Sequence, residues 1–281
     1  MKKVGFKMIG QIWGMESCGS SRMRIMPMFK YDDNFHLWME DETYDAIVFQ
    51  KRHDIAHAKK FNGLKLLDVT DSPWLKEGNH FWNMCKEMDV IISYGIKQMQ
   101  KISEMTKNIP IYLIPDRHDL DEIKINKGEH KGIGEKVIWY GHSANYPTLD
   151  SIYNDIRKAG YKLIVISPGN YKRADVNIKW ELNSYQNHII SGDVVVNPYI
   201  TTGEFYYKCN DKTTLAWMLG MPVANTLDEL LKFKDPDERN FEIKCKQSQL
   251  DLWHIKHSAR EYREIIEKHC REKFGDNIPQ A

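Results

Sequence analysis

Two lysines four residues apart mark the segment of this chain best suited to bind an anion. Lys208 and Lys212 follow the apolar run Val194-Val195-Val196, which is typical of a buried parallel strand. A short apolar helix is expected over residues 213–219, ended by a glycine and a proline. A helix N-terminus supplies about half a positive charge and free N–H groups. Together with two full charges, this arrangement predicts a site for a diphosphate.

Backbone N–H groups from Asn210 to Thr213, at the start of this helix, are expected to bind the same diphosphate. Gly203 and Glu204 belong to the polar loop that leads to the two lysines. The alternative for the lysines is an ordinary solvated loop surface.

Strand-like and helix-like segments alternate along the chain, which indicates βαβ units and parallel sheets. In the first half the strands are expected at 4–9, 45–50, 64–69, 90–93 and 111–114, and the helices at 21–29, 53–61, 74–87 and 96–107. In the second half the strands are expected at 137–140, 163–166 and 194–196, and the helices at 148–159, 213–219, 227–233 and 248–274.

A charged, glycine-bearing stretch at residues 116–136 separates these two halves and is expected to be an interdomain linker. We therefore expect an α/β protein with two Rossmann-like βαβ domains that face a cleft. The first would cover residues 1–125, and the second residues 126–281 including a long C-terminal helix.

Composition excludes several classes of protein. The chain has 281 residues and a formal net charge of +1, whereas a dedicated nucleic-acid binder usually has a strong basic excess. Its five cysteines are scattered without a C-x-x-C pair, so a disulfide framework and a cysteine zinc site are not indicated. We expect a cytoplasmic protein, because neither a signal peptide nor a transmembrane segment is evident.

Residues 193–224 resemble the donor-domain segment of nucleotide-sugar-dependent glycosyltransferases of GT-B fold, of the family 4 (group 1) kind. Lys208-Cys209-Asn210-Asp211-Lys212 is similar to the family's K-S-x-N-K, and Gly220-Met221-Pro222-Val223 to its closing turn. Shorter similarities occur in the same order at residues 18–24, 67–71, 89–99 and 114–116, and at the strand 137–141. One position departs from the family pattern, because Leu215 stands where many members have a ribose-binding glutamate.

This resemblance implies transfer of a sugar from a nucleotide-diphosphate sugar, such as a UDP-sugar, to a hydroxyl acceptor. Lys208 and Lys212 would hold the donor diphosphate without a metal or another cofactor, and Glu204 would replace the missing ribose ligand. His142 and Ser143 would border the donor, and Arg173 is a further candidate for its phosphates. The acceptor is open and includes glycans, small alcohols and modified DNA bases.

Acceptor-side candidates lie after the first and third strands of the N-terminal half. Gly19, Ser20 and Arg22 could contact the acceptor or a phosphate, although Ser20 could equally cap a helix. Asp71 is the favoured general base, with Asp68 as the second choice. The alternative is that Asp71 or Ser72 caps the helix predicted from Trp74 onward.

Metal-like patterns in the sequence are weak. His53-Asp54-Ile55-Ala56-His57 is a variant of the H-E-x-x-H zinc motif without an evident third ligand. Asp119-Leu120-Asp121 and Asp235-Pro236-Asp237 imitate D-x-D but are expected to be solvated turns. We therefore expect no metal site. Two further functions stay open, namely a nucleotide-sugar epimerase or hydrolase on the same fold, and a non-catalytic nucleotide-sugar-binding protein.

Overall fold

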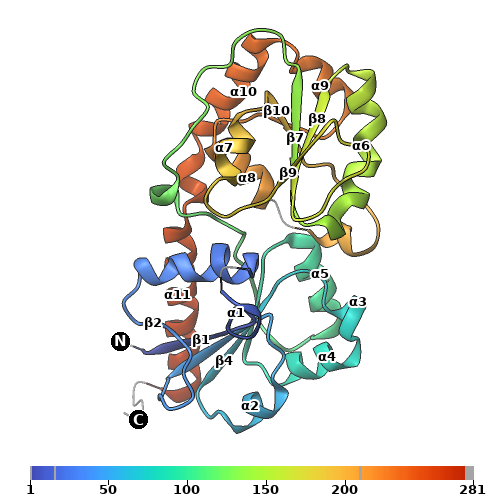
Figure 1. Ribbon diagram of the computed structural model, residues 1–281. Coiled ribbons are helices and arrows are strands. Elements are labelled where there is room, and N and C mark those ends of the chain that lie inside the picture. The colour runs from blue at the N-terminus through green and yellow to red at the C-terminus, as the bar shows by residue number, and fades with distance from the viewer. Residues whose placement is uncertain (1, 16, 209–210, 276–281) are drawn as a thin grey trace. The chain divides into compact units, whose positions relative to one another are not determined.

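The computed structural model describes residues 2–15, 17–208 and 211–275 and divides the chain into two compact units (Figure 1). Unit 1 contains residues 1–119, 207–209 and 254–281, and unit 2 contains residues 120–206 and 210–253. Each unit is built on its own parallel sheet.

Unit 1 has a six-stranded parallel sheet with the strand order β2-β1-β3-β4-β5-β6. Its elements are β1 (Val4–Met8), α1 (Gly10–Trp13), the π-helix η1 (Ser21–Ile25), the 3₁₀ helix η2 (Met26–Lys30), β2 (Phe35–Leu37), β3 (Ala46–Gln50), α2 (Ile55–Lys60), β4 (Leu64–Val69), α3 (Trp74–Glu77), α4 (Asn79–Lys86), β5 (Val90–Ser93), α5 (Ile96–Met105), β6 (Ile111–Leu113) and α11 (Ile255–Phe274). The parallel sheet expected from the first half is confirmed.

Helices cover both faces of this sheet, as parallel sheets require. Alternate residues of β1 and β3, such as Phe6 and Val48, pack with Tyr262 of α11. The opposite face, with Phe49 of β3, packs with Phe81 of α4. Both strands are therefore apolar throughout, except for one lysine in β1 and the glutamine that ends β3.

The C-terminal helix α11 belongs to unit 1, which corrects its expected place in the second domain. Its residues Ile255, Tyr262 and Ile266 are fully buried in the same cluster as Phe6 and Val48. The helix runs beside the blue and teal strands in Figure 1. Its apolar stripe was visible in the sequence, but the stripe carried no information about which sheet it covers.

Unit 2 has a five-stranded parallel sheet with the strand order β11-β10-β7-β8-β9. Its elements are η3 (Leu120–Glu122), β7 (Lys136–Tyr140), η4 (Ser143–Asn145), α6 (Tyr146–Lys158), β8 (Lys162–Ser167), β9 (Val176–Lys179), α7 (Tyr185–Ile190), β10 (Val194–Val196), η5 (Gly203–Tyr207), α8 (Asp211–Met218), β11 (Val223–Ala224), α9 (Leu227–Lys232), α10 (Pro236–Gln247) and η6 (Leu250–Trp253). Each η element here is a 3₁₀ helix.

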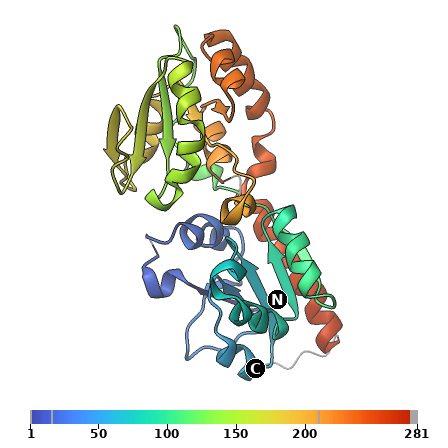
Figure 2. The same cartoon turned by 90° about the vertical axis from the view of Figure 1, so that its right-hand side faces the viewer.

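Helices lie on both faces of this second sheet (Figures 1 and 2), and an apolar cluster packs on each face. Ile152 of α6 and Leu230 of α9 pack on one face. Ile189 of α7 and Leu215 of α8 pack on the other. The sequence did not predict β9, α7 or α10, because β9 is mostly exposed and α10 has a weak apolar stripe.

Residues 116–136 are not a free linker, contrary to expectation. The chain passes from unit 1 to unit 2 between Asp119 and Leu120. The following segment is bonded to unit 2: Lys127 N donates to Leu219 O at 2.9 Å, and His130 N donates to Asn240 Oδ1 at 2.8 Å. Its charged side chains concealed these backbone contacts in the sequence.

Two expected helices are irregular. Residues 21–29 form a π-helix followed by a 3₁₀ helix, and the helix expected over 74–87 is broken at Gly78, whose φ is 53°. Among the described residues, no helix is both long and apolar enough to cross a bilayer.

Candidate binding sites at the two topological switch points

The strand order of unit 2 has its topological switch point between β7 and β10. The chain runs outward from β7 through β8 to β9, and then returns to the other side of β7 as β10 and β11. In open parallel sheets, ligands bind outside the carboxyl ends of the two strands where this direction reverses. Gly141 follows β7 at this point, and Asn197 follows β10.

Lys212, in the first turn of α8, lies against the carboxyl end of β7. Its Nζ is 4.9 Å from the centre of the Trp139 ring, and Tyr140 Oη donates to Lys212 O at 2.5 Å. A Cβ on Gly141, whose φ is 153°, would lie only 2.6 Å from Lys212 Nζ. Glycine at this position therefore leaves room for the ammonium group.

The second strand of the switch point also holds the first turn of α8. Asn197 Nδ2, after β10, donates to Thr213 Oγ1 at 2.9 Å. Since both strands anchor this turn, the helix N-terminus is held at the switch point, and the Lys212 ammonium lies beside Gly141. This is the arrangement that binds phosphate oxygens.

His142 and Ser143 border the same strand end. His142 is exposed, and its Nδ1 accepts a hydrogen bond from Ala144 N at 3.2 Å. Ser143 is close to Gly169 after β8, where an added Cβ would lie 3.3 Å from Ser143 Cβ. The structure thus places His142, Ser143 and Lys212 at the carboxyl end of β7, and Thr213 beside Asn197 at the end of β10.

Arg173 contacts residues of α6, and its candidate role as a phosphate ligand stays a prediction. Its guanidinium lies 3.6 Å from the ring centre of Tyr153 and 3.5 Å from Asp150 Oδ1, both on α6. A further bond runs to Asn154 at 3.4 Å. The side chain is therefore engaged on the outer side of α6.

The loop candidates have different outcomes. Gly203, with a φ of 61°, and Glu204 begin the 3₁₀ helix η5, and Glu204 is half-buried. Asn210 lies outside the described residues. Leu215 is 4% exposed and packs in the apolar cluster against β7. A glutamate could not occupy that position without burying its charge.

Substitution of Gly141 by alanine is expected to weaken nucleotide binding at this site. The new Cβ would displace Lys212 Nζ, and the left-handed φ would strain an alanine. We expect the Kd for UDP to rise about tenfold, since a charged hydrogen bond is worth about 1.5 kcal/mol or more. Isothermal titration calorimetry checks this, with Gly160→Ala, at a positive-φ glycine after α6, as the control for strain alone. Equal UDP affinity of parent and Gly141→Ala contradicts the expectation.

Lys208, expected to act with Lys212, belongs to unit 1 instead. Its Nζ lies 3.0 Å from Asp71 Oδ1. Its neighbour Tyr207 packs edge-on against Trp74 with ring centres 4.9 Å apart, and Tyr207 O accepts a hydrogen bond from Tyr94 Oη. The two lysines therefore belong to different units and contact different partners, and their joint binding of one diphosphate stays a prediction.

Unit 1 has its own switch point, between β1 and β3, because β2 and β3 lie on opposite sides of β1. Here Gly10 N donates to Ser21 Oγ at 3.1 Å, and Ser21 Oγ donates to Gln50 Oε1 at 2.9 Å. Gln50 is fully buried, and its Nε2 has no hydrogen-bond partner among the described residues. A buried donor without an acceptor is costly.

The residue after β3 and a residue just after β4 share an unusual backbone. Lys51 has a φ of 51° and Asp71 a φ of 62°, a region that side chains other than glycine rarely adopt. The two side chains form an ion pair at 2.5 Å. Gln98 Nε2 donates to Asp71 O at 2.5 Å, which helps to hold this conformation. Such strain is typically found at functional sites.

Asp71 is a poor general base in this arrangement. Burial alone would raise its pKa, but the charges of Lys208 and Lys51 and their hydrogen bonds outweigh burial and lower the pKa to about 2. A carboxylate with so low a pKa takes up a proton weakly at neutral pH. The alternative role, capping of the next helix, is also not observed, because Pro73 occupies the N-cap of α3 without a side-chain cap bond.

The Asp71 carboxylate predicts a contribution to acid stability. Because its folded pKa is lowered, its contribution to the free energy of unfolding is present above its ordinary pKa of 3.8 and is lost as the pH falls toward about 2. Urea unfolding of the parent chain should therefore show a loss over this range that Asp71→Asn lacks. Parallel pH curves for the two proteins would contradict this expectation.

Asp68, the second candidate base, is enclosed in the core. It is 0% exposed, and its oxygens accept Arg24 Nε at 3.0 and 3.1 Å and the Tyr262 hydroxyl of α11. Arg24 also pairs with Asp116 at 2.7 Å. Since an acceptor hydroxyl cannot reach Asp68, its expected catalytic role is corrected to a structural one.

Gly19, Ser20 and Arg22 lead into the π-helix η1 beside this switch point. Ser20 makes no side-chain cap bond, and its Oγ lies 3.5 Å from Cys18 Sγ. Arg22 N donates to Cys18 O at 2.9 Å. Cys18 in turn accepts from Ser21 Oγ at 3.5 Å, which connects this loop to Gln50.

The two histidines of the H-D-x-x-H variant have separate partners. His53 Nδ1 lies 2.5 Å from Glu77 Oε2, whereas His57 Nδ1 contacts Lys7 Nζ. Asp54 pairs with Lys7 at 2.8 Å and also accepts His57 N at the start of α2. Lys7, Asp54 and His57 border a cavity of about 680 Å³ in unit 1. The two rings do not converge on one metal position.

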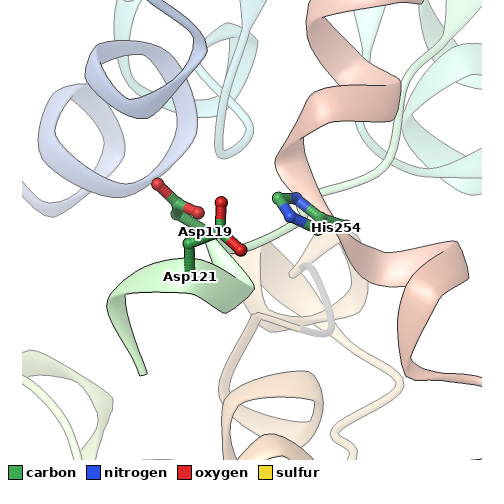
Figure 3. A group of neighbouring side chains, drawn as sticks. All are labelled: Asp119, Asp121 and His254. Carbon is green, nitrogen blue, oxygen red and sulfur yellow. The ribbon is translucent and has the colours of Figure 1, made fainter. Parts of the chain in front are cut away.

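Among the residues that the structure describes, one group of side chains offers ligand atoms at mutual distances that a metal ion could bridge. Asp119, Asp121 and His254 offer atoms within 4.8 Å of one another (Figure 3). Asp119 is buried rather than in the solvated turn expected, and its carboxylate already accepts Tyr31 Oη at 2.6 Å and Lys30 Nζ at 3.2 Å. His254 Nδ1 accepts Lys256 N at 3.2 Å. With these bonds in place, the group gives no reason to assign a metal.

Sequence reasoning missed the roles of Gly141 and Gln50. Gly141 was recognised from the sequence only as the end of the strand 137–141, because a close approach of Lys212 cannot be read from spacing. Gln50 was assigned to a strand, yet a polar residue at the carboxyl end of an otherwise apolar parallel strand was a usable signal.

The two parallel sheets, each with its switch point, are the architecture of the GT-B fold. No known sequence family and no curated protein matches the chain. Similar solved structures include TarM, with 10% identity and a TM-score of 0.59 over 86% of this chain and 56% of that one.

The structure of T4 phage BGT in complex with its UDP-glucose substrate is also similar, with 12% identity and a TM-score of 0.53 over 96% of this chain and 98% of that one. The pneumococcal O-GlcNAc transferase GtfA, in complex with UDP and GlcNAc, has 10% identity and a TM-score of 0.52 over 79% of this chain and 56% of that one. The chain thus spans about 56% of the length of TarM and GtfA.

Proposed function

We propose that this chain is a glycosyltransferase that moves a hexosyl or pentosyl group from a nucleotide-diphosphate sugar to a hydroxyl acceptor. Unit 2 binds the donor, and unit 1 binds the acceptor. The observation that carries the proposal is the fixed ammonium of Lys212 beside Gly141, at the switch point of a GT-B fold.

Stabilisation of the leaving diphosphate is the main catalytic contribution in this proposal. Lys212 and the N–H groups at the start of α8 are held by Tyr140 and Asn197 before the donor arrives. Preorganised charge of this kind acts where negative charge develops in the transition state. The chain itself would supply the positive charge that a bound metal ion supplies in other transferases.

The fold relatives support a UDP-sugar as the first donor to test, since T4 phage BGT was solved with UDP-glucose and GtfA with UDP. A thermal-shift series with nucleoside diphosphates should raise the unfolding temperature most with the correct base. A ligand present at 100 times its Kd adds about 2.7 kcal/mol to stability. No shift with any nucleoside diphosphate would remove the proposal.

A non-catalytic nucleotide-sugar-binding protein is the second candidate. This candidate is favoured because neither predicted base is available to take a proton from an acceptor: Asp68 is buried, and Asp71 is paired with two lysines. Release of UDP from UDP-sugars, measured with and without added glycans and alcohols, separates the candidates. Acceptor-dependent release supports the transferase, and binding without any release supports the second candidate.

A further inference from the structure

The switch point of unit 1 carries polar groups that the proposed donor site does not use. We propose that this switch point binds a phosphate group of the acceptor substrate, through Gln50 Nε2 and the ammonium groups of Lys51 and Lys208. The assignment of this phosphate to the acceptor rests on the proposed function. The existence of the phosphate site does not depend on that function.

The first observation is the unsatisfied donor at the strand end. Gln50 is 0% exposed, its Oε1 is occupied by Ser21, and its Nε2 has no acceptor among the described residues. The amide is immobilised by Ser21, which Gly10 N holds in turn. A ligand oxygen at the crevice would satisfy the donor that the fold leaves open.

The second observation is the charge beside this amide. Lys51 follows Gln50 directly, and its ammonium shares the Asp71 carboxylate with Lys208, at 2.5 and 3.0 Å respectively. One carboxylate thus faces two ammonium groups, which leaves an excess of one positive charge.

The charge balance selects the class of ligand. A carboxylate ligand would gain little by replacing Asp71, because a carboxylate already occupies that place. A phosphate dianion matches two ammonium groups and also offers an oxygen to Gln50 Nε2. The positive φ of both Lys51 and Asp71 indicates that the chain holds these side chains here at a cost in backbone strain.

The experiment measures binding of inorganic phosphate by calorimetry at constant ionic strength and at pH 8. All variants are made in a Lys212→Met background, so that phosphate bound at the unit 2 site does not contribute. We expect the Kd for phosphate to rise at least about tenfold in Lys51→Met and in Gln50→Met, the loss of one charge-assisted hydrogen bond. Lys59→Met, an exposed lysine of α2, is the matched control and should leave the Kd unchanged.

Asp71→Asn provides a variant with the opposite expected result. The variant removes the carboxylate that competes with phosphate for both ammonium groups, so phosphate should bind several-fold more tightly than in the background protein. Circular dichroism confirms folding of each variant. Loss of all phosphate binding in the Lys212→Met background overturns the proposal, and so does a Kd unaffected by Lys51→Met, Gln50→Met and Asp71→Asn.

The same variants, made with Lys212 intact, distinguish this inference from the proposed function. UDP binding should persist in Lys51→Met and Gln50→Met, because these residues belong to unit 1. If the chain binds phosphate as described but binds no nucleoside diphosphate, the unit 1 phosphate site is supported and the transferase function is contradicted. If the protein with Lys212 intact binds UDP but the Lys212→Met protein binds no phosphate, the donor site is supported and this inference is contradicted.

Discussion

Replacement of Lys212 by methionine is expected to raise the Kd for UDP about 10- to 150-fold. Lys212 is the fixed cation at the switch point of unit 2, and a charged hydrogen bond to a phosphate contributes about 1.5–3 kcal/mol. Methionine retains the length and the apolar stem that packs near Trp139. The affinity for UDP, measured by calorimetry, and the rate of UDP release from UDP-sugars should both fall.

Lys208→Met is the matched control, because it removes the same charge from the same loop but from unit 1. Its ion pair with Asp71 is partly exposed, so UDP affinity should change by no more than about fivefold. An equal loss in the two variants would mean that both lysines bind the diphosphate, as the spacing in the sequence predicted. An unchanged Kd in Lys212→Met would remove the donor site.

Asp68→Asn is expected to lower the free energy of unfolding by about 3 kcal/mol, the lower end of the range for breaking a buried ion pair. Arg24 would remain 4% exposed in the core of unit 1 without its principal counter-charge, although Asp116 still contacts it. Tyr262 would also lose its carboxylate acceptor. Urea unfolding measures the change.

Asp116→Asn removes the charge of the second carboxylate that pairs with Arg24. Asp116 is partly exposed, so this variant should lose about 1 kcal/mol, the usual value of one hydrogen bond. The contrast between the two variants is the diagnostic result. A loss below about 1 kcal/mol in Asp68→Asn would show that the Arg24–Asp68 pair is not required for the core.

Periodicity in the sequence predicted both parallel sheets, because buried strands such as residues 64–69 and 90–93 are apolar without interruption. It also predicted the strand, loop and helix that position Lys212. Exposed elements escaped prediction, as β9 shows, because their residues face solvent and carry no apolar pattern.

The candidate site was less accessible to the sequence, for a reason that Lys208 illustrates. Its spacing from Lys212 predicted one paired site, but spacing does not report which unit packs a loop residue. Only contacts with Asp71 and Trp74 place that segment in unit 1. Asp68 was misassigned for a similar reason, because its burial depends on α11, nearly 200 residues later in the chain.

The return of α11 to the first sheet sets the order in which the polypeptide can fold during synthesis. All of unit 2 lies between residues 120 and 253, so the ribosome releases it before Ile255, Tyr262 and Ile266 emerge. Until then, Phe6 and Val48 of the nascent first sheet are not buried by α11, and this sheet exposes an aggregation-prone apolar face. A chaperone that shields this face would have to stay bound until α11 emerges from the ribosome. Unit 2 does not contain α11 and can therefore fold co-translationally before this helix is made.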